Sequence, residues 1–249
     1  MCDMIEDLYI YNEFKKFESK FKNSLDPNPL SPFNAQIGFG VTAKNWKNQK
    51  YSSGCKGHKL LFKTHNIISS FCFNCYKIEI HPGTVLELFK LMFLFNNLRL
   101  ENNNHRKLWL RPRKEIPVNY SGTIYFQSLD EAKKVLEDLK SFLDKEISSN
   151  IPIKVKRGCS EFNNILPNYH DINESYDSLV SDKKKWHEIE NNFDLSNAAN
   201  NLPALTINEN PSIGDFNKNH FRIMYTWLTF ARSIGDDSYM KVTETFLDR

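Results

Sequence analysis

The sequence predicts an α+β fold, because strand-like and helix-like patterns follow one another in a fixed order through the middle of the chain. Four short stretches alternate apolar and polar residues, as half-buried strands do, at 76–80, 106–111, 123–127 and 151–156. Apolar residues at helical spacing follow the first and the third of these stretches. The predicted order is therefore strand, helix, strand, strand, helix, strand.

The first strand and the first helix are joined by a turn with clear end signals. Tyr76–Ile80 alternates apolar with charged residues, and His81–Gly83, which contains a proline, then turns the chain. Thr84 is a suitable N-cap for a helix that runs to Phe95. We interpret the histidine of this turn as structural and not as a catalytic base.

The second half of the unit repeats this order. Pro112 ends the second strand, and Ser121-Gly122 opens the third. Ser128 or Asp130 caps a helix with one apolar face, made of Ala132, Val135, Leu136, Leu139, Phe142 and Leu143. The fourth strand contains Pro152, which places it at an edge of the sheet.

Together the six elements form the ferredoxin-like split βαβ (βαββαβ) unit, which we expect to span residues 72–160. An N-terminal extension, residues 1–71, precedes it. This extension begins with an amphipathic helix at 3–24, which a proline-rich stretch ends. An irregular, cysteine-containing stretch at 33–70 then leads to the core.

A C-terminal extension, residues 161–249, follows the core. Its first part is polar, and the asparagine-rich stretch 190–212 is typical of a linker. Its last part is a helix that Asp215 caps and Gly235 ends. Because one face of this helix is apolar, we expect it to dock on the open face of the sheet or on the N-terminal helix.

The composition is that of a soluble globular protein. Hydrophobic residues make up 40% of the chain, so a core can form, and the net charge of +3 is too small to indicate a polyanion partner by itself. The most apolar window, 86–95, contains two charges and is too short to cross a bilayer. The acidic N-terminus lacks the pattern of a signal peptide. We therefore expect a cytoplasmic protein with no membrane partner, whose cysteines stay reduced.

The positions of the cysteines predict a metal site. Cys72 and Cys75 precede the first strand, and Cys159 follows the fourth. In the split βαβ sheet the spatial order is fourth, first, third, second strand, so the start of the first strand lies beside the end of the fourth. Cys55, in a glycine-rich stretch upstream, can reach the same point. Convergent thiols in a reducing compartment indicate a bound metal before they indicate disulfides.

Two ligand sets are compatible with this convergence. One is a four-thiolate set for Zn²⁺ or an iron–sulfur cluster, made of Cys55, Cys72, Cys75 and Cys159. The other is a local zinc site with two pairs at two-residue spacing, made of Cys55, His58, Cys72 and Cys75. We favour zinc, since no Cys-x2-Cys-x2-Cys run occurs, and expect a structural role because four protein ligands leave no open position. The alternative is a group of unliganded thiols that pack as small hydrophobic side chains.

One face of the predicted sheet is basic and aromatic. Alternation places on it Lys77, Lys107, Trp109, Arg111, Tyr125, Lys154 and Lys156. Rings among cations suit single-stranded RNA, because bases stack on the rings while the cations hold phosphates. We expect instead that the terminal helices cover this face and bury Trp109 and Tyr125, because the apolar face of the C-terminal helix must pack on something.

An enzymatic function is the third possibility. No nucleotide-binding glycine-rich loop, His-Glu-x-x-His helix or Gly-x-Ser-x-Gly elbow occurs in the sequence. Cys159 follows Arg157 closely, and a cationic neighbour favours a reactive thiolate. If the protein is an enzyme, we therefore expect it to use a cysteine nucleophile or an iron–sulfur cluster. The sequence indicates neither a reaction nor a small-molecule substrate.

Overall fold

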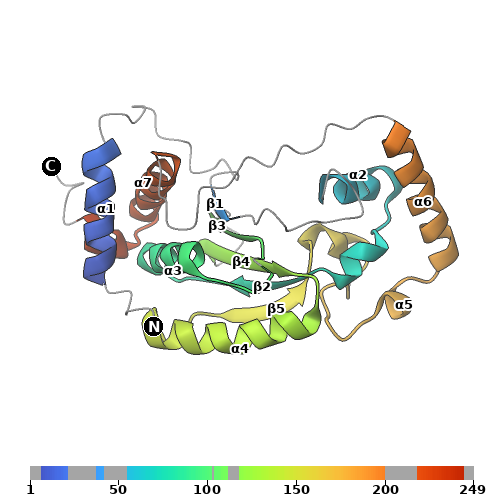
Figure 1. The fold of residues 1–249 in the computed structure, drawn as a ribbon, viewed down its shortest axis with the longest axis horizontal. Helices are drawn as coiled ribbons and strands as arrows, with labels where there is room; N and C mark the ends of the chain where they lie inside the picture. The colour runs from blue at the N-terminus through green and yellow to red at the C-terminus, as the bar shows by residue number, and fades with distance from the viewer. Residues whose placement is uncertain are drawn as a thin grey trace.

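The computed structural model describes six stretches of the chain, which build a mixed fold of helices around one antiparallel sheet (Figure 1). These stretches are 7–21, 38–41, 55–102, 104–111, 118–199 and 218–243. The predicted α+β class is confirmed, whereas the predicted Asp215 cap and the strand end at Pro112 lie outside the described residues. Among the helices of these stretches, none combines the length and the apolar character of a membrane span.

The sheet has the strand order β1-β3-β4-β2-β5, and every neighbouring pair is antiparallel. The strands are β1 (Gly38–Val41), β2 (Tyr76–Ile80), β3 (Arg106–Leu110), β4 (Tyr120–Phe126) and β5 (Ile153–Arg157). The four strands predicted from alternation are β2 to β5, and they lie side by side in the predicted order. β1, from the stretch 33–70 that was expected to be irregular, adds a strand along the outer edge of β3.

Two crossover helices and the sheet enclose the main core. The helices are α3 (Val85–Asn97) and α4 (Leu129–Glu146). Their apolar side chains pack with those of one sheet face, among them Ile78, Leu108 and Ile124. Thr84 caps α3 through a capping box, and Ser128 caps α4. The core position of Ile78, Leu108 and Ile124 confirms the sheet faces that were assigned from alternation along the strands.

The ends of the chain pack against α3. The elements are α1 (Asp7–Phe21), α7 (Lys218–Ser233), the 3₁₀ helix η4 (Asp237–Tyr239) and α8 (Met240–Thr243). Phe14 of α1 lies 5.5 Å from Phe221 of α7, and Trp227 of α7 stacks on Phe89 of α3 at 5.9 Å, measured between ring centroids. Of the two docking places expected for the C-terminal helix, α7 packs on the N-terminal helix. It ends before Gly235, whose φ of 76° lies in the left-handed region that favours glycine.

A second group of helices covers the end of the sheet where β2 begins and β5 ends (Figure 1). It comprises α2 (Cys55–His65), η2 (Ser70–Asn74), η3 (Ser160–Asn164), α5 (Tyr176–Leu179) and α6 (Lys183–Ala199). Two small apolar cores hold these elements in place, one around Phe73 and Phe162 and one around Leu61 and Phe193. Glu190 of α6 accepts a hydrogen bond from the Ser69 hydroxyl at 2.6 Å, which fastens α6 to the segment before η2.

Two of these helices correct the sequence prediction. α2 lies within 33–70, which was expected to be irregular, and α6 occupies the first half of the expected linker at 190–212. Trp186, Ile189 and Phe193 recur on one side of α6 and pack with the small core on α2. Tertiary packing thus stabilises helix where the local composition favours a loop.

Candidate functional site

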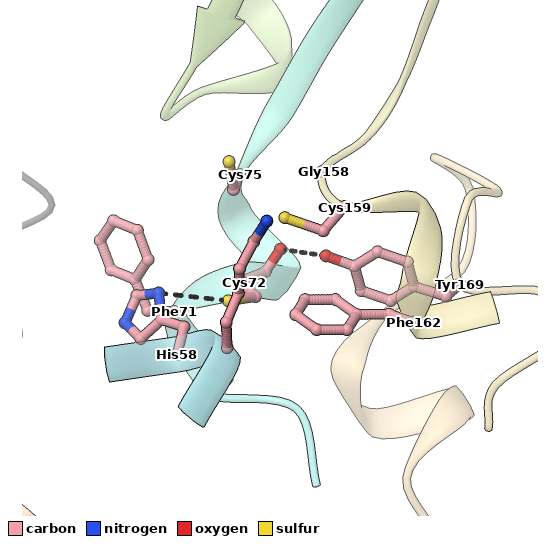
Figure 2. Close-up of a pocket in the computed structure, with 9 residues that line it drawn as sticks. His58, Phe71, Cys72, Cys75, Gly158, Cys159, Phe162 and Tyr169 are labelled. Carbon is pink, nitrogen blue, oxygen red and sulfur yellow. Dashed lines mark hydrogen bonds between the residues drawn. The ribbon is translucent and has the colours of Figure 1, made fainter. Parts of the chain in front are cut away.

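Three segments distant in sequence meet in a small pocket at the end of the sheet (Figure 2). The pocket has a volume of about 20 Å³, which is room for a single water-sized occupant. Its lining residues are His58, Lys59, Phe71, Cys72, Cys75, Gly158, Cys159, Phe162 and Tyr169. The adjacency of the first and fourth predicted strands therefore brings Cys72, Cys75 and Cys159 to one pocket.

Strand pairing places Cys159 near Cys75. The antiparallel ladder of β2 and β5 has Tyr76 and Arg157 as its last pair, and Cys75 lies one residue and Cys159 two residues beyond this pair. Just beyond the ladder, the Gly158 N–H donates a hydrogen bond to the Cys75 carbonyl at 2.8 Å. A Cβ atom on Gly158 would lie 3.0 Å from the Tyr169 hydroxyl, closer than side chains normally pack. The absence of a side chain at this position therefore lets the two segments approach.

A buried arginine fixes the loops around the pocket. Arg157 is 2% exposed and donates from Nε to the Phe73 carbonyl at 3.0 Å and from Nη1 to the Tyr169 carbonyl at 2.9 Å. Its Nη2 donates to the Glu174 carbonyl. The Tyr169 hydroxyl donates to the Cys72 carbonyl at 2.7 Å, and burial raises the pKa of this tyrosine, so it remains a protonated donor. From the sequence, Arg157 was assigned only as a cationic neighbour of the Cys159 thiol. Its burial was not predicted, because a cation at the end of a strand ordinarily lies at the surface.

His58 and Cys72 form a close pair on the α2 side of the pocket. The Nδ1 atom of His58 lies 3.4 Å from the Sγ atom of Cys72, and the two residues are 2% and 5% exposed. The pocket therefore joins members of both predicted ligand sets, His58 from one and Cys159 from the other. Cys55, common to both sets, is the first residue of α2, and its side chain lies outside the described part of the structure.

The cysteines of the pocket are thiols. Cys72, Cys75 and Cys159 form no disulfide. Within the described residues, no three His, Cys, Asp or Glu side chains are grouped in a way that could hold a metal ion. Their assignment as ligands of zinc or of an iron–sulfur cluster therefore stays a prediction.

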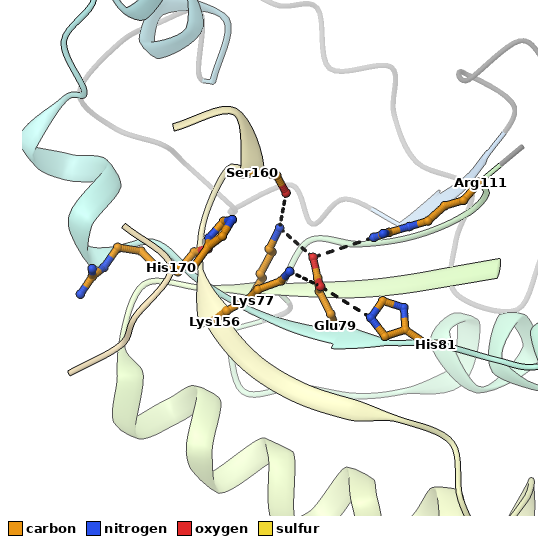
Figure 3. Close-up of polar contacts among 8 residues, drawn as sticks. Lys77, Glu79, His81, Arg111, Lys156, Ser160 and His170 are labelled. Atoms are coloured by element: carbon orange, nitrogen blue, oxygen red, sulfur yellow. Dashed lines mark hydrogen bonds and ion pairs between the residues drawn. The ribbon is translucent and has the colours of Figure 1, made fainter. Parts of the chain in front are cut away.

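The sheet face opposite α3 and α4 carries a buried carboxylate among cations (Figure 3). Glu79 is 2% exposed, and its carboxylate oxygens lie 2.6 Å from Lys156 Nζ and 2.9 Å from Lys77 Nζ. Arg111 and His81 approach the same carboxylate at 3.9 Å and 3.7 Å. Burial opposes ionisation of Glu79, but the two lysines outweigh it and lower the pKa of the carboxyl to about 2.

The two half-buried aromatic rings of this face already have partners. Lys107 Nζ lies 4.7 Å from the ring centroid of Trp109 and 5.4 Å from that of Tyr125. The Arg111 guanidinium lies 5.5 Å from the Trp109 ring. His105 stacks on Tyr125, with the ring centroids 5.5 Å apart. Nucleobases would have to displace these neighbours in order to stack.

The terminal helices do not cover this face. α1 and α7 pack on α3 and join the core on the opposite side of the sheet, so the expectation that they bury Trp109 and Tyr125 is wrong. The physical reason is that α3 is buried on nearly all sides, with Leu86, Met92 and Phe93 all in the core. A helix that is apolar all round needs a second layer of cover, which the terminal helices supply.

The opposite end of β2 is closed by the C-terminal segment. Asp236 accepts hydrogen bonds from the Val85 N–H and from the Tyr120 hydroxyl, both at 2.6 Å. Its carboxylate thus occupies the N-terminus of α3, the place where an external anion would otherwise bind. His81 lies in the turn before this helix, as predicted. Burial and the nearby Arg111 lower the pKa of His81, so its imidazole is neutral at neutral pH.

Known proteins give no further guide to function. Neither a protein-family model, nor a curated protein, nor a solved structure matches this chain. A fold alone does not define a function, so the functional inference depends on the side chains of the pocket and of the sheet face.

Proposed function

We propose that the pocket is a structural zinc site at the end of a ferredoxin-like sheet. The proposed ligands are His58, Cys72, Cys75 and Cys159. One observation carries the proposal: three thiols and an imidazole from segments far apart in the sequence line a single pocket with room for one ion.

The sheet supports the assignment of the core to the ferredoxin-like class. The four central strands have the order β5-β2-β4-β3, all pairs are antiparallel, and α3 and α4 share one core with one sheet face. This is the arrangement expected of a split βαβ unit, with β1 as an addition to its edge. The assignment bears on the site because this topology sets the first and fourth strands side by side, with the cysteines at their adjoining ends.

Zinc fits the pocket better than an iron–sulfur cluster does. Zn²⁺ accepts thiolate and imidazole ligands together, at about 2.3 Å to sulfur and about 2.0–2.1 Å to nitrogen. A cluster contains several iron and sulfide atoms and is held mainly by four thiolates. The cavity of about 20 Å³ has room for one ion, and one of its four candidate ligands is an imidazole. Binding would require the side chains to turn toward the centre of the pocket, which the free energy of metal binding can drive.

The proposed role of the ion is to stabilise the fold. Four protein ligands leave no coordination position for a substrate. The ion would join α2, η2 and the segment after β5, which otherwise pack through small cores around Phe73 and Leu61. Because the free energy of metal binding is then partly folding free energy, these segments would depend on the metal. A reducing compartment such as the cytoplasm, expected from the cysteines, keeps the thiols available as ligands.

The other two functions expected from the sequence have less support. A single-stranded RNA platform needs rings that can accept bases, and the rings of Trp109 and Tyr125 already stack with cations and with His105. A nucleophilic Cys159 needs a base, and the imidazole of the pocket, His58, pairs with Cys72.

Metal content tests the proposal. We expect the anaerobically purified chain to be colourless and to contain about one zinc ion per molecule by mass spectrometry. Cys72→Ser should lower the zinc content and the melting temperature, and should speed hydrogen exchange across 55–75. Cys2→Ser is the matched control, because it removes a thiol that the site does not use. A brown protein with iron and sulfide would favour the cluster, and unchanged metal content and melting temperature in Cys72→Ser would argue for unliganded thiols.

A further inference from the structure

On the sheet face that carries Glu79, positively charged side chains outnumber carboxylates. Three cations converge on Glu79: Lys156 at 2.6 Å, Lys77 at 2.9 Å and Arg111 at 3.9 Å. All three are largely shielded from water, because their side chains are only 21%, 7% and 22% exposed, respectively. Glu79 compensates one of these charges directly, and Glu161 of η3 acts on Lys77 from farther away while it pairs with Lys59 at 3.3 Å. Positive charge therefore remains in excess, and uncompensated charges with little access to solvent are costly.

The neighbouring strands add cations to this face and no further acid. Strand register places Lys154 directly opposite Glu79, and Lys107 one strand farther away on the other side. Among the described residues of β2 to β5, Glu79 is the one carboxylate of this face. His81 and His170 stay neutral at neutral pH, because burial lowers the pKa of each and nearby cations add to this effect.

Four buried polar atoms on this face lack a hydrogen-bond partner within the described part of the chain. They are Thr123 Oγ1, Ser121 Oγ, His81 Nδ1 and Arg111 Nε. Thr123 is 1% exposed and lies directly opposite Glu79 in the adjoining strand β4. Buried polar groups nearly always have a partner, so a missing acceptor points to a bound water or ion. Guanidinium, ammonium and hydroxyl groups are the donors that bind phosphate oxygens in proteins.

We propose that this face binds a small phosphate-type oxyanion, held by Lys77, Arg111 and Lys156 beside Glu79. The oxyanion supplies the negative charge that the cluster lacks and accepts a hydrogen bond from Arg111 Nε. The recognised group is a phosphate and not a nucleobase, because the aromatic rings of the face already stack with cations. The site does not depend on the proposed zinc, since none of its residues lines the cysteine pocket.

Stabilisation by added anion measures this binding, because a ligand that binds the folded state raises the melting temperature. The full chain is titrated with sodium phosphate and with sodium pyrophosphate, with sodium chloride at equal ionic strength as the reference. We expect both phosphates to raise the melting temperature above the reference. Lys156→Gln should weaken the apparent affinity about tenfold, as the loss of one charge-assisted hydrogen bond does. Lys140→Gln, an exposed lysine on α4, is the matched control and should leave the affinity unchanged.

Glu79→Gln distinguishes a ligand site from a closed cluster of ion pairs. Removing the competing carboxylate should strengthen pyrophosphate binding and enlarge its effect on the melting temperature, although the variant alone is less stable than the wild type. Equal responses to pyrophosphate and to sodium chloride in both proteins would overturn the proposal. A stabilisation by a single-stranded oligonucleotide, with none by phosphate or pyrophosphate, would also overturn it, because the ligand would then be a polyanion.

Discussion

Replacing Glu79 by Gln tests the electrostatic account of the sheet face in the folded protein itself. Burial of this carboxyl raises its pKa, but Lys77 and Lys156 outweigh burial and lower the pKa from 4.5 to about 2. A carboxyl with a depressed pKa in the folded state stabilises the fold at pH values above 4.5, and the stabilisation is lost as the pH falls toward 2. At about 1.36 kcal/mol per pH unit, this shift corresponds to about 3 kcal/mol.

We therefore expect Glu79→Gln to lower the free energy of unfolding at pH 7 by about 3 kcal/mol, measured by urea denaturation in a buffer without phosphate. The wild type should lose this increment between about pH 5 and pH 2, where the free energy of unfolding of the variant should change less. Glu137→Gln, an exposed carboxylate on α4, is the matched control. A loss below about 1 kcal/mol at pH 7, as an exposed ion pair would give, would refute the reasoning.

Two further substitutions test the packing that positions the sheet and the pocket. Gly122→Ala should lower the free energy of unfolding by about 1–3 kcal/mol, because the added Cβ would lie 2.8 Å from Leu91 Cδ2 and 2.9 Å from Leu108 Cδ2 in a filled core. An unchanged urea midpoint would show that the leucines repack without strain. Tyr169→Phe removes the shorter of two hydrogen bonds to the Cys72 carbonyl, which keeps the Cys75 N–H at 3.3 Å, and should cost about 1 kcal/mol, with faster hydrogen exchange around the pocket. Exchange equal to that of the wild type would contradict the fixing role given to this hydrogen bond.

Local patterns in the sequence predicted the elements that local chemistry determines. Alternation in Tyr76–Ile80 indicated both the strand and the face that each of its side chains occupies, because the side-chain period of a strand is fixed. The caps at Thr84 and Ser128 could be predicted because capping involves residues only three positions apart. The strand order then brought the thiols of Cys72 and Cys159 to one pocket, although the two residues are far apart in the sequence.

Features that depend on distant contacts escaped prediction. Arg157 resembles a surface cation in the sequence, and it is buried because the Phe73 carbonyl of η2 and two carbonyls of the segment between η3 and α5 converge on its guanidinium. No local signal pairs Asp236 with the start of α3. The apolar face of the last helix predicted that it must dock, but the partner depends on α3, whose outer side is also apolar. Sequence spacing favoured a ligand set of local pairs that contained His58. The strand topology favoured a set that contained the distant Cys159, so the two residues were assigned to different sets.

X-ray absorption at the zinc edge of the purified full chain tests the proposed zinc site most directly. The account predicts a shell of about three sulfurs at about 2.3 Å and one nitrogen at about 2.0–2.1 Å, with the nitrogen lost in His58→Ala. A shell of four sulfurs would replace His58 by Cys55 as the fourth ligand. A shell of oxygen and nitrogen alone, or an anaerobically purified chain without zinc, would contradict a zinc site formed by Cys72, Cys75 and Cys159.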